Sequence, residues 1–326
     1  MNAAILPEIE DRPKAAPLPA LAYRRLLAPT DFSEPSLKAL DYALDLASPT
    51  GSNVRMIHVL QPSADYLNFD TLSVLRPDEE AEAECEEEMR RVAHQRRHTR
   101  AEITWKVAVG RPAAEIIEAA KEFRAELLVV STHGRTGLKH LLLGSVAERI
   151  VRYAPCPVLI VRKHEREITP PPEYHSMGIN VHRILVPTDF SPRSLASLRY
   201  AARFARAFGG KITLFHSLNL FAGFVPSEYP VIDGATYRAA EEAVMREADR
   251  CLQECVPDDL AEEAVVQTGP PLSEIPAFAE EGKFDLIICA THSAAPLQHV
   301  LLGSTAEQII RHAGCPVLVV GDNTMV

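Results

Sequence analysis

The stretch Arg25-Leu26-Leu27-Ala28-Pro29-Thr30-Asp31-Phe32-Ser33 returns 158 residues later as Arg183-Ile184-Leu185-Val186-Pro187-Thr188-Asp189-Phe190-Ser191. Two more segments return at nearly the same spacing. The sequence from His140 to Ser145 reappears from His299 to Ser304, and the sequence from Cys156 to Val161 reappears from Cys315 to Val320. Three separated repeats with one common spacing indicate a duplicated domain.

The bulk composition predicts a soluble globular protein. The chain has 326 residues, of which 47% are hydrophobic and 24% are charged, and this length is typical of two domains. A net charge of −10 argues against a nucleic-acid partner. The absence of an apolar run of about 20 residues argues against a membrane partner. Six cysteines make no disulfide framework, so we expect a cytoplasmic protein.

The repeats divide the chain into four parts. Residues 1–22 are acidic and proline-rich and lack the basic start of a signal peptide, so they are expected to form a flexible N-terminal tail. Residues 23–162 form the first domain, called copy one here, and residues 182–322 form the second, called copy two. Residues 163–181 include three consecutive prolines, which are typical of a semi-extended linker.

Short aliphatic runs alternate with amphipathic stretches through both copies. Leu127–Val130 and Val158–Val161 are apolar at every position, which is typical of strands that are buried on both faces. The order βαβαβαβαβ predicts an α/β fold in each copy, a doubly wound five-stranded parallel sheet with helices on both faces. In copy one, helices are expected at 34–47, 78–97, 113–123 and 145–153.

The loop Pro29-Thr30-Asp31 directly follows the first predicted strand. In open parallel sheets, ligands bind at the carboxyl ends of the strands, where a carboxylate accepts hydrogen bonds from a ribose or from ring nitrogens. An aspartate here can instead cap the next helix. Ser33 and Ser191 are better placed as caps, because Pro192 follows Ser191 at the first helical position. We therefore favour a binding role for Asp31.

A second loop, residues 131–140, leads to Gly144-Ser145 at a predicted helix start. Gly134 and Gly144 allow close backbone approach, and the free amides of the helix start favour an anion. Arg135 and Lys139 add positive charge, so the loop is a candidate triphosphate cradle.

Two features of this loop have alternative explanations. Ser145-x2-Glu148 and Ser304-x2-Glu307 both have the form of a capping box, although one serine can cap a helix and also contact a phosphate. His133 and its counterpart His292 can contact a phosphate or stabilise a local turn.

Motifs of catalysis and metal binding are missing from the sequence. We find no phosphate loop with lysine, no nucleophile elbow and no nucleophile–base pair. The pair Cys251 and Cys255 has no second pair at zinc spacing, so both are expected to be ordinary core or surface residues rather than metal ligands. The sequence therefore predicts no catalytic residue and no metal ligand, and it favours a nucleotide holder over an enzyme.

The chain resembles the universal stress protein family, and specifically its tandem two-domain members. The resemblance is carried by Pro-Thr-Asp-Phe-Ser in both copies, by His58-Val59 and by the signature Gly-x2-Gly-x9-Gly-Ser/Thr. In copy one the signature reads Ser131-x2-Gly134-x9-Gly144-Ser145, with serine in place of the first glycine. The resemblance covers nearly the whole chain, from about Tyr23 to Val320.

The resemblance implies a strand order of 3-2-1-4-5 and pairing of the two fifth strands into an internal pseudo-dimer, which can pair again as a homodimer. It implies ATP with Mg²⁺ in copy one, with Asp31 near the ribose and the backbone of Val59 at the adenine. Gly134, Gly144, Ser145 and the amide of Val146 would hold the phosphates. The candidate binding residues of copy one are Pro29, Thr30, Asp31, Val59, Val130, Ser131, His133, Gly134, Arg135, Lys139, Gly144, Ser145 and Val146.

Copy two departs further from the family signature, which reads Ala290-x2-Ser293-x9-Gly303-Ser304. Arg135 and Lys139 align with Ala294 and Gln298, so both cations are lost. Each missing charge costs on the order of 1–3 kcal/mol where it makes a charge-assisted hydrogen bond to phosphate, and we expect little or no nucleotide binding. The weak candidates are Thr188, Asp189, Ser217, His292, Gly303, Ser304 and Thr305.

These observations predict a cytoplasmic stress-response protein that binds ATP in copy one as a conformational or assembly signal. Two alternatives remain open at this point. One is a scaffold or interaction module that needs no nucleotide, and the other is a slow ATPase. The protein partner is not identified by the sequence.

Overall fold

The computed structural model describes residues 21–61, 79–97, 99–132, 143–162, 179, 181–219, 233–291 and 303–321. Helices and strands alternate through both copies, as the periodicity predicts. Copy one contains β1 (Arg25–Pro29), α1 (Glu34–Ala47), the 3-10 turn η1 (Ser48–Thr50), β2 (Asn53–Leu60), α2 (Glu79–Gln95), β3 (Glu102–Val109), α3 (Pro112–Phe123), β4 (Leu127–Ser131), α4 (Ser145–Tyr153) and β5 (Val158–Val161). Copy two contains β6 (Arg183–Pro187), α5 (Pro192–Phe208), β7 (Lys211–Leu218), α6 (Gly234–Cys255), β8 (Ala261–Thr268), α7 (Pro271–Glu281), β9 (Leu286–Ala290), α8 (Ser304–His312) and β10 (Val317–Val320).

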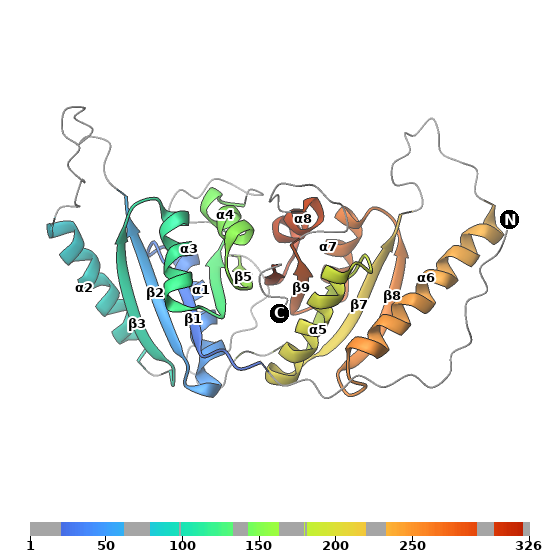
Figure 1. Ribbon diagram of the computed structural model, residues 1–326, viewed down its shortest axis with the longest axis horizontal. Coiled ribbons are helices and arrows are strands. Elements are labelled where there is room, and N and C mark those ends of the chain that lie inside the picture. The colour runs from blue at the N-terminus through green and yellow to red at the C-terminus, as the bar shows by residue number, and fades with distance from the viewer. Residues whose placement is uncertain are drawn as a thin grey trace, which may run out of the picture.

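The ten strands form one sheet in the order β3-β2-β1-β4-β5-β10-β9-β6-β7-β8 (Figure 1). Within each copy the neighbouring strands are parallel. The two copies meet at β5 and β10, which pair antiparallel with Leu159 opposite Leu318. The predicted α/β fold with parallel sheets is therefore confirmed.

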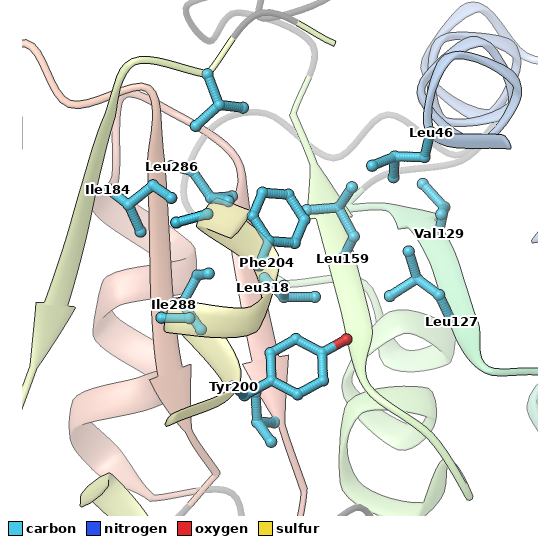
Figure 2. Packing of buried hydrophobic residues seen from close by; sticks show 14 of the residues in the cluster. Leu46, Leu127, Val129, Leu159, Ile184, Tyr200, Phe204, Leu286, Ile288 and Leu318 are labelled. Carbon is cyan, nitrogen blue, oxygen red and sulfur yellow. The ribbon is translucent and has the colours of Figure 1, made fainter. Parts of the chain in front are cut away.

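Helices cover both faces of this sheet because its central strands carry buried apolar side chains on both faces. In β1, Leu26 and Ala28 contact a core on one face, while Leu27 contacts a core on the other. The first core also receives side chains from α1, α2, α5 and α6, and the second receives them from α3, α4, α7 and α8. Each core contains residues of both copies, and Figure 2 shows Leu159 close to Leu318 and Phe204 in the first.

The start of copy one also packs against copy two. The buried hydroxyl groups of Tyr23 and Tyr200 are hydrogen-bonded at 2.6 Å, and the Tyr23 ring stacks on Phe208 with centroids 5.8 Å apart. The N–H of Leu21 donates to the carbonyl of Arg203 at 3.3 Å. Burial and the neighbouring phenol raise the pKa of Tyr23, so this contact is between neutral groups.

The two serines that were predicted as helix caps have different outcomes. Ser191 caps α5 as predicted, because its Oγ accepts the N–H of Ser194 at 3.2 Å. Ser33 occupies the same position at α1, but its side chain makes no cap hydrogen bond.

The two predicted capping boxes are wrong. Gly144 and Gly303 are the N-caps of α4 and α8, so the serines that follow are already the first helical residues. A first helical residue cannot accept the capping hydrogen bond, and the glutamates form ion pairs along the helix instead. Glu148 accepts from Arg152 at 2.8 Å, and Glu307 accepts from Arg311 at 3.0 Å.

Cys156 and Cys315, which precede β5 and β10, lie in the second core. Cys156 is 6% exposed and Cys315 is 2% exposed. Among the helices that the structure describes, none is long and apolar enough to cross a membrane.

Candidate functional site

The turn after β1 is held by its own side chains. Asp31 Oδ1 accepts the N–H of Ser33 at 3.1 Å and its hydroxyl at 2.5 Å. Thr30 Oγ1 accepts the N–H of Phe32 at 3.0 Å, and the left-handed φ of Phe32, +64°, completes the turn. Asp31 therefore forms a local turn rather than a helix cap, and this turn fixes the direction of its carboxylate.

The end of β2 holds the same turn from the other side. The N–H of Thr30 donates to the carbonyl of Ile57 at 2.8 Å, and His58 Nδ1 donates to the carbonyl of Thr30 at 2.8 Å. The His58 ring also stacks on Phe32, with centroids 4.7 Å apart. These contacts place the Asp31 turn beside the backbone of Val59.

The chain that leaves β4 returns to it at Gly144. The N–H of Gly144 donates to the carbonyl of Thr132 at 3.0 Å, and the N–H of Thr132 donates to that of Val161 at 3.1 Å. A Cβ atom on Gly144 would lie 3.0 Å from the Thr132 oxygen, so a larger residue fits poorly. This return brings the N-terminus of α4, with its free amides and positive dipole end, to the carboxyl end of the sheet.

These parts surround one cavity of about 560 Å³, which is within the usual range for small-molecule sites. Nine of the predicted binding residues line it: Pro29, Thr30, Asp31, Val59, Val130, Ser131, Gly144, Ser145 and Val146. His133, Gly134, Arg135 and Lys139 lie outside the described residues.

Most of the helical and apolar lining of this cavity is not predicted by the sequence motifs. Pro112 and Ile116 of α3 and Ala147 and Ile150 of α4 line it, and Ser36 of α1 does so as well. All five residues are repeated in copy two, as Pro271, Ile275, Ala306, Ile309 and Ser194. An alignment of the two copies beyond the motifs would have found them.

Copy two builds the same turn and the same histidine contact. Asp189 Oδ1 accepts the N–H of Ser191 at 3.0 Å, and Phe190 has a φ of +59°. His216 Nδ1 donates to the carbonyl of Thr188 at 2.9 Å. Burial lowers the pKa of His216.

This turn also borders a cavity, of about 360 Å³. Of the weak candidates, Thr188, Asp189, Ser217, Gly303 and Thr305 line it. Ser304 begins α8 and is not among the described lining residues, and His292 lies outside the described part of the chain.

Comparison with known proteins gives the same family for both copies. The model of the universal stress protein family matches residues 22–162 and 180–321. Universal stress protein MJ0531 of Methanocaldococcus jannaschii is 35% identical over 150 residues, which are 44% of this chain and 85% of that protein. Universal stress protein YxiE of Bacillus subtilis is 33% identical over 147 residues, which are 43% of this chain and 99% of that protein.

A solved structure is similar over both copies. The crystal structure of a universal stress protein from Archaeoglobus fulgidus has a TM-score of 0.61 and 24% identity, and the match covers 91% of this chain and 98% of that one. At 24% identity, this structural similarity shows a shared fold. The family model and the relatives show similarity of sequence. The chain therefore belongs to the universal stress protein family and carries two of its domains in tandem.

Proposed function

We propose that the protein binds ATP with Mg²⁺ in the cavity of copy one and uses it as a conformational or assembly signal in a cytoplasmic stress response. The observation that carries the proposal is the cavity itself. It joins the Asp31 carboxylate, the backbone of Val59 and the N-terminus of α4, which are groups suited to a ribose, a base and a phosphate.

The chemistry of each wall supports a nucleotide. The Asp31 carboxylate accepts hydrogen bonds from ribose hydroxyls, and Ile116 and Ile150 offer apolar surface to a flat base. The amides at Gly144, Ser145 and Val146 suit phosphate oxygens. Within the described residues no three metal-ligating side chains gather, so Mg²⁺ would be held by phosphate oxygens and water.

Helix α4 offers a route from the cavity to a partner. Its first turn borders the cavity, while its surface exposes Val146 at 37% and Tyr153 at 48%. Exposed apolar side chains suit a protein contact. A ligand bound at the first turn of α4 would therefore lie on the same helix as the exposed Tyr153, which is the connection that an assembly signal requires. The pairing of β5 with β10 supports the proposal that the two copies act as an internal pseudo-dimer.

The test is a calorimetric titration of the full chain with Mg-ATP, after mass spectrometry has shown that no nucleotide remains bound. Gly144→Val places a side chain against the Thr132 carbonyl and should reduce ATP affinity at least 10-fold, by about 1.4 kcal/mol or more. Gly303→Val is the matched control, because it makes the same change at the N-cap of α8.

One ATP site that is lost in Gly144→Val and kept in Gly303→Val supports the proposal, provided that both variants keep their melting temperature. Two sites would show that copy two binds ATP as well. No uptake by a nucleotide-free protein would contradict the proposal and favour a scaffold.

A further inference from the structure

A groove of about 590 Å³ runs between α3 and α4 on the surface of copy one. The two helices lie side by side on one face of the sheet (Figure 1). The residues that line the groove come from both helices: Ala113, Ala114 and Ile117 of α3, and Ser145, Glu148, Arg149, Arg152 and Tyr153 of α4. The small alanine side chains of α3 leave space between the helices, so the groove has room for a short segment of polypeptide.

The groove combines exposed apolar surface with an unpaired cation. Ala114 is exposed, Ile117 is half-buried and Tyr153 is 48% exposed. The exposed side chain of Arg149 makes no hydrogen bond or ion pair with any residue in the described part of the chain. A partner that covers this groove therefore needs apolar side chains and at least one acidic group.

A second arginine in the groove keeps hydrogen-bond donors that its counterpart in copy two uses. Arg152 Nη2 donates to Glu148 at 2.8 Å, but Arg152 Nε is buried and has no hydrogen-bond partner among the described residues. In copy two, Arg311 donates to Glu307 through Nε, at 3.0 Å, and also through Nη2. The copy-one guanidinium is therefore less completely satisfied by its own glutamate, and a carboxylate is the group that best completes it.

The corresponding surface of copy two has different chemistry. Three lining residues of the groove are replaced there by residues of another kind: Ala113 by Leu272, Arg149 by Gln308, and Tyr153 by His312. Copy two thus has a larger side chain where α3 has an alanine, and it lacks both the unpaired arginine and the exposed phenol. The combination of apolar surface and cation is specific to copy one.

We propose that this groove binds the segment Ile5-Leu6-Pro7-Glu8-Ile9-Glu10-Asp11 of the same chain. The segment lies outside the described residues, and its assignment follows from its chemistry and from the length of the chain that follows it. It contains all three acidic residues of positions 1–20, which complement the two groove arginines, and three large aliphatic residues, which suit the apolar lining. The inference goes beyond the proposed function, because it assigns an interaction surface that needs no nucleotide.

The chain between the segment and the described structure is long enough for this contact. The segment ends ten residues before Leu21, and ten residues extend to about 33–36 Å. Leu128 of β4 pairs with Leu27 of β1 and with Val158 of β5, so the starts of β1 and β5 are two strand spacings apart, about 10 Å. Leu21 lies four residues before β1 and Tyr153 lies five residues before β5. Both therefore lie toward the amino-terminal edge of the sheet, and the spacer can join them.

The test is photo-cross-linking within the full chain. The photoreactive residue p-benzoylphenylalanine replaces Ile9, and mass spectrometry identifies the linked peptides of the monomeric protein after irradiation. We expect the links to fall on α3 and α4. Arg149→Glu should lower their yield about 5-fold or more, because it removes an attraction and adds a repulsion toward the acidic segment. Gln308→Glu is the matched control, since it places the same charge at the equivalent position of copy two, and it should leave the yield unchanged.

Reversing the charge of the segment should restore the contact. The combination of Glu8→Lys, Glu10→Lys and Asp11→Lys with Arg149→Glu is expected to recover most of the wild-type yield. An equal yield in Arg149→Glu and the wild type would overturn the proposal. So would links to other parts of the chain only, links only between two molecules, or no links.

Two further measurements separate this inference from other effects. Melting temperatures show whether each variant remains folded. Titration with Mg-ATP reports the cavity separately, because Arg149 does not line it. Loss of ATP binding in every variant and in the wild type would count against the proposed function and not against the groove.

Discussion

The two copies share one binding frame and differ in the charge that surrounds it. Both form a Thr-Asp-Phe turn in which the phenylalanine has a left-handed backbone conformation. In both, a histidine ring nitrogen donates a hydrogen bond to the threonine carbonyl and so stabilises the turn. Copy one has a cavity of about 560 Å³ and two loop cations, whereas copy two has about 360 Å³ and neither cation. The turn therefore belongs to the architecture of the domain, and we expect the ligand that each copy binds to depend on the surrounding loop and cavity walls.

The largest effect is expected when the two loop cations are introduced into copy two, because this removes its charge difference from copy one. We expect Ala294→Arg combined with Gln298→Lys to raise the ATP affinity of copy two by about 100- to 10,000-fold, since each charge-assisted hydrogen bond contributes about 1.5–3 kcal/mol. Calorimetry should then find two ATP sites instead of one. The reverse change, Arg135→Ala with Lys139→Gln, should remove the site of copy one.

Ala294→Gln alone is the matched control, because it adds a polar side chain without charge. Its stoichiometry should stay at one. A double variant that also stays at one would show that cations are not what separates the two copies.

The two copies also differ in the side chains that they contribute to their junction, which is therefore not symmetric. Tyr23 aligns with Val181, so the Tyr23–Tyr200 hydrogen bond has no counterpart across the junction of the two copies. Tyr23→Phe leaves the buried Tyr200 hydroxyl without this partner and should lower the free energy of unfolding by about 1–3 kcal/mol. Urea denaturation followed by circular dichroism measures the loss.

The double variant Tyr23→Phe with Tyr200→Phe should lose less than the sum of the two single variants, because no orphaned hydroxyl remains. Fully additive losses would contradict an energetic coupling between the two hydroxyls.

The smallest expected effect is on the pH dependence of the free energy of unfolding, to which His216 of copy two contributes. Burial lowers the pKa of His216 in the folded state, so below about pH 6.5 the unfolded chain takes up a proton before the folded one does. The contribution to stability is therefore fully present above that pH and is lost as the pH falls toward the folded pKa. The slope cannot exceed about 1.4 kcal/mol per pH unit for one group.

Chemical denaturation of the wild type and of His216→Asn, between about pH 7.5 and pH 5, isolates this contribution. As the pH falls, the free energy of unfolding should decrease more for the wild type than for His216→Asn. A difference that is constant with pH would contradict the lowered pKa of this half-buried histidine.

Local sequence patterns predicted the fold well, because runs such as Leu127–Val130 and Val158–Val161 are apolar at every position and belong to strands covered on both faces. The Asp31 turn was also predictable, because a short segment forms it. The capping boxes were not, because the N-cap at Gly144 depends on its hydrogen bond to Thr132, twelve residues earlier. Pro112 and Ile116 reach the cavity only through the crossover of α3, and no local pattern contains that information.

The β5–β10 pair has a consequence for how the protein behaves on dilution. Its two partners are parts of one polypeptide, so they meet at an effective concentration that the chain itself sets. A pairing between separate chains weakens as protein becomes scarce, but this one does not. The two cavities therefore stay in a fixed ratio of one to one in every molecule, whatever the protein concentration.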